Sequence, residues 1–222
     1  MVAMADASLL RNTELFSGLD PALLGRLASQ SALRRIHRGD VLFTEGEEAS
    51  ELFVVVSGRI AMTNKSPDGR ESVVALMEGG DLFGEMPLFD GQGRSAEARA
   101  LMTSEVVAVP YSPIRALYGE RPELLWQVVG LLSRRLRNMD EALADSVFLD
   151  VTGRTAKRLL ELAGEADEFT LPVTQEELAG MVGASRERVN KAIASFVRLG
   201  WIEQGDRRYV ITDREQLGRR AR

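Results

Sequence analysis

The sequence predicts an α+β protein that consists of an antiparallel β domain, a long helix and a helix-turn-helix domain. Short apolar runs separated by glycines fill the amino half, and a heptad repeat of apolar residues follows. Near the carboxyl end, two helical segments flank a glycine. With 222 residues, the chain has room for one large domain or two small ones.

Composition excludes several classes of protein. Apolar residues make up 45% and charged residues 27% of the chain, which excludes disorder and collagen-like structure. The chain has no cysteine, and His37 is its one histidine, so disulfides, iron–sulfur clusters and histidine-based metal sites are not expected. No apolar run approaches the ~18 residues of a membrane span, and no secretory signal is evident. We expect a cytoplasmic protein that binds neither a metal nor a membrane.

Charge is distributed unevenly along the chain. The net charge is −5 overall, with −7 over residues 1–150 and +2 over residues 151–222. Such an asymmetry indicates different roles for the two parts. The carboxyl part is therefore the one expected to meet a polyanion.

The amino half predicts a sheet domain preceded by helices. The first forty residues are expected to form short helices, one of which begins with Asp20 as N-cap and Pro21 in its first turn. From about Ile36 to Val109, apolar runs predict strands at residues 41–43, 52–56, 59–62, 72–77 and 106–109. The glycines that separate them recur every 7 to 12 residues, at Gly39, Gly46, Gly58, Gly69 and the adjacent pair Gly79 and Gly80. This spacing is typical of an antiparallel sandwich or jelly roll.

A long helix is expected after Pro122, with Gly130 inside it and the next break at Gly153. Residues along it alternate steps of four and three, at Leu125, Val129, Leu132, Leu136, Met139, Leu143 and Ser146. This seam is typical of a two-stranded coiled coil; alternatively, one helix face packs on the chain's own sheet. We expect a homodimer joined along this helix. The predicted domains are residues 1–121, the dimerisation helix and hinge at 122–149, and residues 150–222.

Residues 175–194 predict a helix-turn-helix after a helix at residues 155–163. Thr174 and Glu177 form a capping box that opens the first helix of the motif. Gly183 falls at the turn, which requires a left-handed backbone, and Ser185 is a natural N-cap for the second helix. Small or apolar residues that would pack the two helices together are Leu178, Ala179, Val182, Val189 and Ile193.

The outer face of the second helix predicts a DNA-reading surface. Residues 185–198 carry a net charge of +3, and the exposed positions are Arg186, Glu187, Arg188, Asn190 and Lys191. In a recognition helix, arginine binds guanine and glutamate accepts from cytosine in the major groove. The alternative is a solvated charged face on an ordinary helical hairpin.

Residues 201–212 predict a winged hairpin that turns at Gly205 and Asp206. Arg207 and Arg208 lie at its tip, where they either reach phosphates or are simply exposed.

Residues 83–96 form a cassette with the composition of a nucleotide site. Gly84 lets the backbone approach a ligand, Glu85 supplies an acceptor for ribose hydroxyls, and Arg94 with Ser95 supplies donors for an anion. The alternative is a polar loop with a structural Arg–Glu pair.

From about Leu15 to the wing, the chain resembles the cyclic-AMP receptor (Crp/Fnr) family of bacterial transcription regulators. The resemblance rests on the cassette G-E-M-P-L-F-D-G-Q-G-R-S-A, the hinge F-L-D-V-T-G-R at residues 148–154, and V-G-A-S-R-E-R-V-N-K at residues 182–191. It implies a β-roll that binds a cyclic nucleotide, a dimerisation helix and a winged helix-turn-helix domain. The implied allosteric ligand is cyclic AMP, ahead of cyclic GMP. The implied partners are double-stranded DNA, a second copy of the chain and RNA polymerase.

The resemblance also implies site residues. Gly84 and Glu85 would hold the ribose, and Arg94 and Ser95 the cyclic phosphate. The full implied ligand set is Gly84, Glu85, Met86, Arg94, Ser95, Ala96, Arg135, Met139 and Asp140. The recognition helix would read a G-T-G-A-like half-site through Arg186, Glu187 and Lys191, with Thr174 and Ser185 on phosphates. The implied DNA-binding set is Thr174, Ser185, Arg186, Glu187, Arg188, Lys191, Arg207 and Arg208.

One position departs from the family pattern. The cyclic-AMP members carry a hydroxyl residue where this chain has Met139, usually beside another polar residue, here Asp140, and these groups meet the adenine across the dimer. Because a thioether cannot donate a hydrogen bond, the departure bears on base identity and on coupling.

The family's iron–sulfur branch needs cysteines, and its haem branch needs an axial ligand, for which this chain offers only His37.

The leading hypothesis is a dimeric regulator in which a nucleotide shifts an existing equilibrium toward the DNA-binding state. The alternative keeps DNA binding but is constitutive or responds to a different ligand. An enzyme is not expected, because the acidic cluster Glu45, Glu47 and Glu48 has no supporting motif and is typical of a solvated turn.

Overall fold

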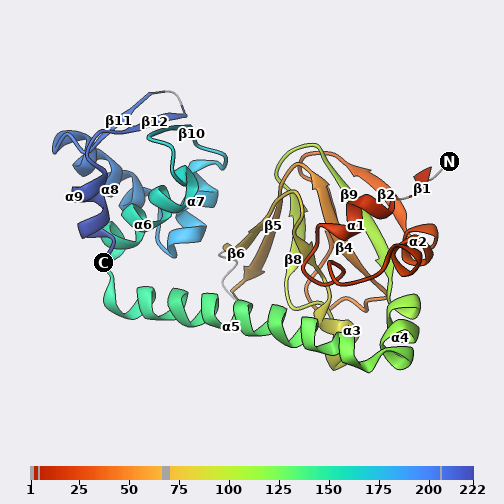
Figure 1. Ribbon diagram of the computed structural model, residues 1–222. Coiled ribbons are helices and arrows are strands. Elements are labelled where there is room, and N and C mark those ends of the chain that lie inside the picture. Colours follow the sequence, from red (N-terminus) through yellow and green to blue (C-terminus); the bar gives the residue numbers. More distant parts are fainter. Residues whose placement is uncertain (1–2, 5, 67–70, 206) are drawn as a thin grey trace. The chain divides into compact units, whose positions relative to one another are not determined.

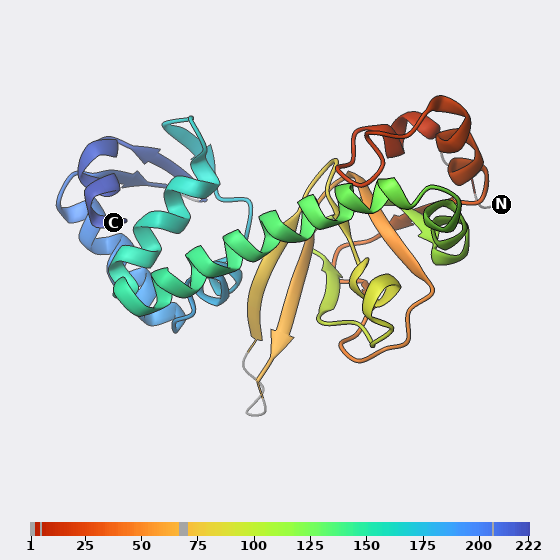
Figure 2. The same cartoon turned by 60° about the horizontal axis from the view of Figure 1, so that its bottom comes forward.

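The computed structural model describes residues 3–4, 6–66, 71–205 and 207–222. The chain divides into two compact units, one formed by Met1–Lys65 and Val73–Leu136 and the other by Ser66–Ser72 and Arg137–Arg222. Helix α5 (Leu125–Phe148) is continuous and contributes to both units (Figures 1 and 2). In the described part of the chain, no helix is long and apolar enough to cross a membrane.

Two sheets form the frame of the first unit. Its strands are β1 (Ala3–Met4), β2 (Ala32–Ile36), β3 (Val41–Phe43), β4 (Glu51–Ser57), β5 (Ile60–Lys65), β6 (Glu71–Met77), β7 (Leu82–Phe83), β8 (Glu97–Ala100) and β9 (Ser104–Pro110). One sheet has the order β1-β2-β9-β4-β7 and the other the order β3-β8-β5-β6. The β2–β9, β4–β9 and β5–β8 pairs are antiparallel. The helices are α1 (Ala7–Arg11), α2 (Pro21–Ser29), α3 (Met86–Asp90), α4 (Tyr111–Glu120), the 3₁₀ turn η1 (Pro122–Leu124) and the first part of α5.

Strand β4 shows how the sheets are filled, because its side chains alternate between two cores. Phe53 and Val55 join the cluster between the two sheets, in which the rings of Phe53 and Phe83 stack 5.4 Å apart. Leu52 and Val54 face the opposite way and pack with residues of α1, α2, α4 and α5. The result is a β-roll with helices on the outside of its first sheet (Figure 1), as the sequence predicted.

The sequence prediction was wrong or incomplete at several elements of this unit. Residues 32–36 were placed among helices, but they form β2, which pairs along its whole length with β9. This long-range pairing outweighs local preference. The short elements α3, α4, β7 and β8 were not predicted. Gly58 marks a turn as expected, since its φ is 92° and an added Cβ would lie 2.6 Å from the Ser104 backbone. Gly69 lies outside the described residues.

Helix α5 has two apolar faces. Val128 and Leu131 are each 4% exposed and belong to the core of the first unit. Six apolar residues of the seam are 38% to 69% exposed, and these are Leu125, Val129, Leu132, Leu136, Met139 and Leu143. One face therefore packs on the chain's own domain, while the heptad seam is left uncovered in a single chain.

The second unit is a helical domain with a small sheet. Its elements after α5 are α6 (Val151–Ala163), β10 (Glu168–Thr170), α7 (Gln175–Val182), α8 (Arg186–Arg198), β11 (Ile202–Gln204), β12 (Arg208–Ile211) and α9 (Arg214–Arg220). The sheet order is β10-β12-β11. The predicted hairpin is present as β11 and β12, and a helix that was not predicted, α9, follows it. Asp213 caps this helix by accepting from the Gln216 amide at 3.0 Å, a local signal that the sequence interpretation missed.

Candidate functional site: a buried arginine cradle and a helix-turn-helix

The loop that carries Arg94 is fastened to the turn at Glu45–Glu48. The Arg94 amide donates to the Glu47 carbonyl at 2.9 Å, and the Gly46 amide donates to the Arg94 carbonyl at 2.8 Å. Gly93 permits this approach, because an added Cβ would lie 2.6 Å from the Gly46 oxygen. The three glutamates of this turn are exposed, as expected for a solvated turn.

The Arg94 guanidinium is buried among neutral acceptors and is only 5% exposed. Its Nη1 donates to the Gly84 carbonyl and its Nη2 to the Glu51 carbonyl, each at 2.8 Å. The ring of Phe43 lies 4.0 Å from its Cζ, close enough for a cation–π contact. Burial lowers the pKa of Arg94, although the phenol of Tyr111 and the carboxylate of Glu51 act in the opposite direction.

This cation has capacity left for an anion. Within the described chain, no carboxylate forms an ion pair with Arg94, and its Nε is buried without a hydrogen-bond partner. A buried charge and a buried donor that lack partners are costly. Arg94 and the groups around it (Phe43, Glu51, Gly84 and Tyr111) are called the cradle below. The cradle is suited to a ligand that brings both a negative charge and an acceptor.

Glu85 is fully buried beside this cradle and is tied to α5. Its Oε1 forms an ion pair with Nη1 of Arg135, whose Nη2 donates to the Leu82 carbonyl. Its Oε2 is buried and has no hydrogen-bond partner among the described residues. The Arg–Glu pair of the alternative interpretation thus exists, but its arginine is Arg135 and not Arg94. The unused Oε2 is an acceptor that a ligand hydroxyl would satisfy.

The other implied ligand residues differ in their surroundings. Gly84 has a φ of 76°, and an added Cβ would lie 2.6 Å from Nη1 of Arg94, so glycine is required there. Ala96 is buried, while Ser95 is exposed and its Oγ donates to Sδ of Met86 at 3.4 Å. Met139 and Asp140 lie further along α5, where both are exposed.

Sequence reasoning missed two residues of the cradle. Tyr111, at the start of α4, donates to the Gly84 carbonyl and accepts from Nη1 of Arg94 at 3.3 Å. Burial raises the pKa of Tyr111, although Arg94 acts in the opposite direction. Phe43 was predicted only as part of a strand. Neither lies near the cassette in sequence, so no local signal identified them.

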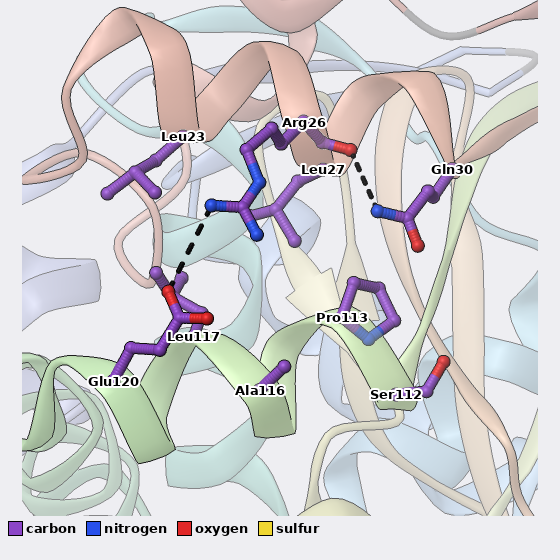
Figure 3. A pocket seen from close by; sticks show the side chains of 9 residues that line it. All are labelled: Leu23, Arg26, Leu27, Gln30, Ser112, Pro113, Ala116, Leu117 and Glu120. Carbon is purple, nitrogen blue, oxygen red and sulfur yellow. Dashed lines mark hydrogen bonds and ion pairs between the residues drawn. The ribbon is translucent and has the colours of Figure 1, made fainter.

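A separate pocket of about 330 Å³ lies between α2 and α4 (Figure 3). Its apolar lining includes Leu23, Leu27 and Leu117, and at its rim Arg26 faces Glu120 across 4.0 Å. It contains none of the predicted site residues. Because its rim charges are paired with each other, we assign it no role.

The helix-turn-helix has the predicted caps and turn. The Glu177 amide donates to Oγ1 of Thr174 at 3.2 Å, and the Thr174 amide donates to Oε2 of Glu177 at 2.6 Å, which completes the capping box. Gly183 ends α7 with a φ of 67°. Ser185 caps α8 by accepting from the Arg188 amide at 3.4 Å. The predicted inner-face residues are buried, and these are Leu178, Ala179, Val182, Val189 and Ile193.

The outer face of α8 is free for a partner. All five predicted polar residues are exposed, and these are Arg186, Glu187, Arg188, Asn190 and Lys191. Within the residues that the structure describes, none of these side chains forms an ion pair or a hydrogen bond. An exposed, unpaired set of cations on one helix face is an electrostatic surface for nucleic acid.

The wing residues are exposed but already have partners. Arg208 forms an ion pair with Glu168 at 2.5 Å, and Nη2 of Arg207 donates to the Leu171 carbonyl at 3.1 Å. Arg207 adopts a left-handed backbone with a φ of 59°. Asp206, the predicted turn residue, lies outside the described residues.

Comparisons with known proteins match both units. The sequence model of the cyclic nucleotide-binding domain matches residues 33–121, and that of the Crp-like helix-turn-helix domain matches residues 153–220. The chain is 38% identical to the CRP-like cAMP-activated global transcriptional regulator of Mycobacterium tuberculosis, over 96% of this chain and 99% of the relative. It is 31% identical to the cAMP-activated global transcriptional regulator Vfr of Pseudomonas aeruginosa, over 85% and 92% of the two chains.

Solved structures show the same architecture. The c-di-GMP responsive global regulator CLP of Xanthomonas campestris matches with a TM-score of 0.75 and 26% identity, over 86% of this chain and 99% of that one. The catabolite activator protein of Thermus thermophilus matches with a TM-score of 0.54 and 30% identity, over 94% and 98%.

The two matched domains, together with the fold, define a DNA-binding transcription regulator with a cyclic nucleotide-binding domain. The chain belongs to the Crp/Fnr family. It is a regulator and not an enzyme, in agreement with the sequence analysis. Among the described residues, no group of three or more potential ligands could hold a metal ion.

Proposed function

We propose that this protein is a homodimeric transcription regulator that binds pseudo-palindromic promoter sites and is gated by cyclic AMP. Because its partner is DNA, we place it in the cytoplasm. The proposal joins two regions, the Arg94 cradle and the α8 face. It takes RNA polymerase as a further partner, in keeping with the regulatory role of the family.

The observation that carries the nucleotide assignment is the pair of unused groups in the cradle. Nε of Arg94 needs an acceptor and Oε2 of Glu85 needs a donor, and both are buried. A cyclic phosphate would pair with the guanidinium, and a ribose hydroxyl would donate to the carboxylate. Bound cyclic AMP would supply both groups in one molecule.

Two relatives named as cAMP-activated regulators favour cyclic AMP as the ligand. A second candidate is a different ligand, because CLP is named as responsive to c-di-GMP. The exposed Met139 also favours testing this alternative, since it lacks the hydroxyl of the cyclic-AMP members.

The uncovered seam of α5 supports the dimer. Six exposed apolar residues in heptad spacing on one helix are the pattern that a second copy would bury. A two-fold dimer would present two α8 helices to half-sites about one helical turn, or ~10–10.5 base pairs, apart.

Calorimetric titration of ligand-stripped protein tests the proposal. The protein is unfolded and refolded to remove any ligand and is then titrated with cyclic AMP, cyclic GMP and c-di-GMP. We expect cyclic AMP to bind with one molecule per chain and more tightly than the other two. If only c-di-GMP binds, then c-di-GMP and not cyclic AMP is the ligand. If none of the three nucleotides binds, the protein is a constitutive regulator.

A further inference from the structure

The heptad register of α5 places two charged residues beside the seam. With Val129, Leu136 and Leu143 at a and Leu132 and Met139 at d, Arg135 falls at g and Asp140 at e. Residues at g and e flank the apolar contact between paired helices and form the ion pairs that set orientation. In a parallel pair, a g residue lies beside the e residue of the partner's next heptad, which here is Asp140 beside Arg135.

Contacts within the first unit fix the orientation of the Arg135 side chain. Its Nη1 pairs with the buried Glu85, and its Nη2 donates to the Leu82 carbonyl. The Arg135 side chain nevertheless remains 31% exposed. Its charge is therefore held in place beside the seam and remains accessible to a second carboxylate.

Asp140 has no partner among the described residues of its own chain. Its side chain is exposed, and within the described chain it forms no ion pair or hydrogen bond, although Arg137 precedes it by three residues on the same helix. Glu141, the next residue, is also exposed but falls at position f, away from the seam. Of these two neighbouring carboxylates, only Asp140 is placed to meet another chain.

We propose that Asp140 of each subunit forms an ion pair with Arg135 of the other subunit. Because Arg135 also pairs with Glu85, these linked ion pairs connect each cradle to the partner helix. The pairing rests on the proposed dimer and requires it to be parallel. Charge favours that orientation, because the g positions are Val128, Arg135 and Ala142. An antiparallel pair would set g beside g, and Arg135 would meet no carboxylate there.

The test measures dimer dissociation of the full ligand-free chain by analytical ultracentrifugation, with Glu141→Gln as the matched control for Asp140→Asn. Exposed ion pairs are weak and two form per dimer, so we expect Asp140→Asn to raise the dissociation constant about threefold to fivefold at low salt. The difference should disappear near 1 M salt, where the Debye length is about 3 Å. Glu141→Gln should leave the constant within about twofold of wild type.

A double-mutant cycle identifies the partner of Asp140. In an Arg135→Gln background, Asp140→Asn should have no further effect on dimer dissociation. The proposal is overturned if Asp140→Asn and Glu141→Gln behave alike, or if the effect of Asp140→Asn persists without Arg135. A wild-type chain that stays monomeric at micromolar concentration would instead refute the dimer of the proposed function, and the ion pair with it.

Discussion

The two proposed binding regions, the cradle and the outer face of α8, use their positive charges in opposite ways. Arg94 is 5% exposed and is held by backbone carbonyls, a phenol and an aromatic ring. The cations of α8, among them Arg186 and Lys191, are exposed and have no partner in the described chain. A buried, oriented cation suits one small anion, whereas an exposed set suits a polyanion whose counterions it releases. Removing the cradle cation should therefore abolish ligand binding, whereas substitutions on the helix should have graded, salt-dependent effects.

The largest effect is expected at the cradle. Arg94→Ala should abolish cyclic AMP binding, because truncating one partner of a buried charge pair costs about 2–5 kcal/mol or more. Calorimetry measures the loss, and circular dichroism should show an intact fold. Arg38→Ala, which removes an exposed arginine of the same unit, is the control and should bind normally. Unchanged affinity in Arg94→Ala would mean that the cassette is only structural.

A smaller, sequence-dependent effect is expected on the helix. Arg186→Ala should lose about 1–3 kcal/mol at the cognate site and relax the preference for one guanine. Fluorescence anisotropy with cognate and scrambled duplexes measures this difference. Arg198→Ala, at the exposed end of the same helix, should keep the preference. If Arg186→Ala keeps it too, α8 is not the reading helix.

A comparison of two buried tyrosines tests whether the Tyr111 hydroxyl contributes to nucleotide binding. The Tyr111 hydroxyl contacts both the Gly84 carbonyl and Arg94, whereas the buried Tyr118 hydroxyl has no hydrogen-bond partner in the part of the chain that the structure describes. Tyr111→Phe should therefore weaken cyclic AMP binding by about 0.5–1.5 kcal/mol. Tyr118→Phe removes no hydrogen bond, so its nucleotide affinity should be that of wild type. Equal affinities in the two variants would remove Tyr111 from the site.

Position 139 tests how the two regions are coupled. Met139 adds apolar packing to the seam but cannot donate a hydrogen bond, so we expect a coupling energy near the low end of the usual ~1–3 kcal/mol. Met139→Thr should increase the ratio of DNA affinities measured with and without saturating cyclic AMP. Strong gating in wild type, together with an unchanged ratio in Met139→Thr, would show that residue 139 plays no part in the switch.

The smallest effect is expected at the wing. Arg208 is exposed and forms an ion pair with Glu168. It can therefore contact a DNA phosphate only if this ion pair breaks. Arg208→Ala should weaken all DNA sequences alike and reduce the slope of log affinity against log salt by about one. A loss confined to the cognate sequence would assign Arg208 to base reading instead.

The helix-turn-helix could be predicted from the sequence almost completely, because its signals are local. The capping box of Thr174 and Glu177, the left-handed Gly183 and the cap Ser185 each depend on residues only a few positions away. The exposure of the α8 face follows from the 3.6-residue period of an α-helix, which separates its polar positions from its apolar ones.

The cradle could be predicted only in part, because its geometry depends on long-range contacts. The motif identified Gly84, Glu85 and Arg94, but two other acceptors of Arg94 come from β4 and α4, distant in sequence. The sequence alternative of an Arg–Glu pair had the wrong arginine, since Arg135 reaches Glu85 from α5, fifty residues further on. Strand β2 was missed for a related reason, because its ladder with β9 forms only in the fold.

The central claim is that occupancy of the cradle changes the DNA affinity of the helix-turn-helix. The most direct measurement is the affinity for one cognate duplex, with and without saturating cyclic AMP, in wild type and in Arg94→Ala. We expect cyclic AMP to tighten DNA binding in wild type, by a coupling energy near the low end of ~1–3 kcal/mol, and to have no effect in Arg94→Ala. The same affinity with and without cyclic AMP in wild type, or an equal cyclic AMP effect in both proteins, would contradict the account.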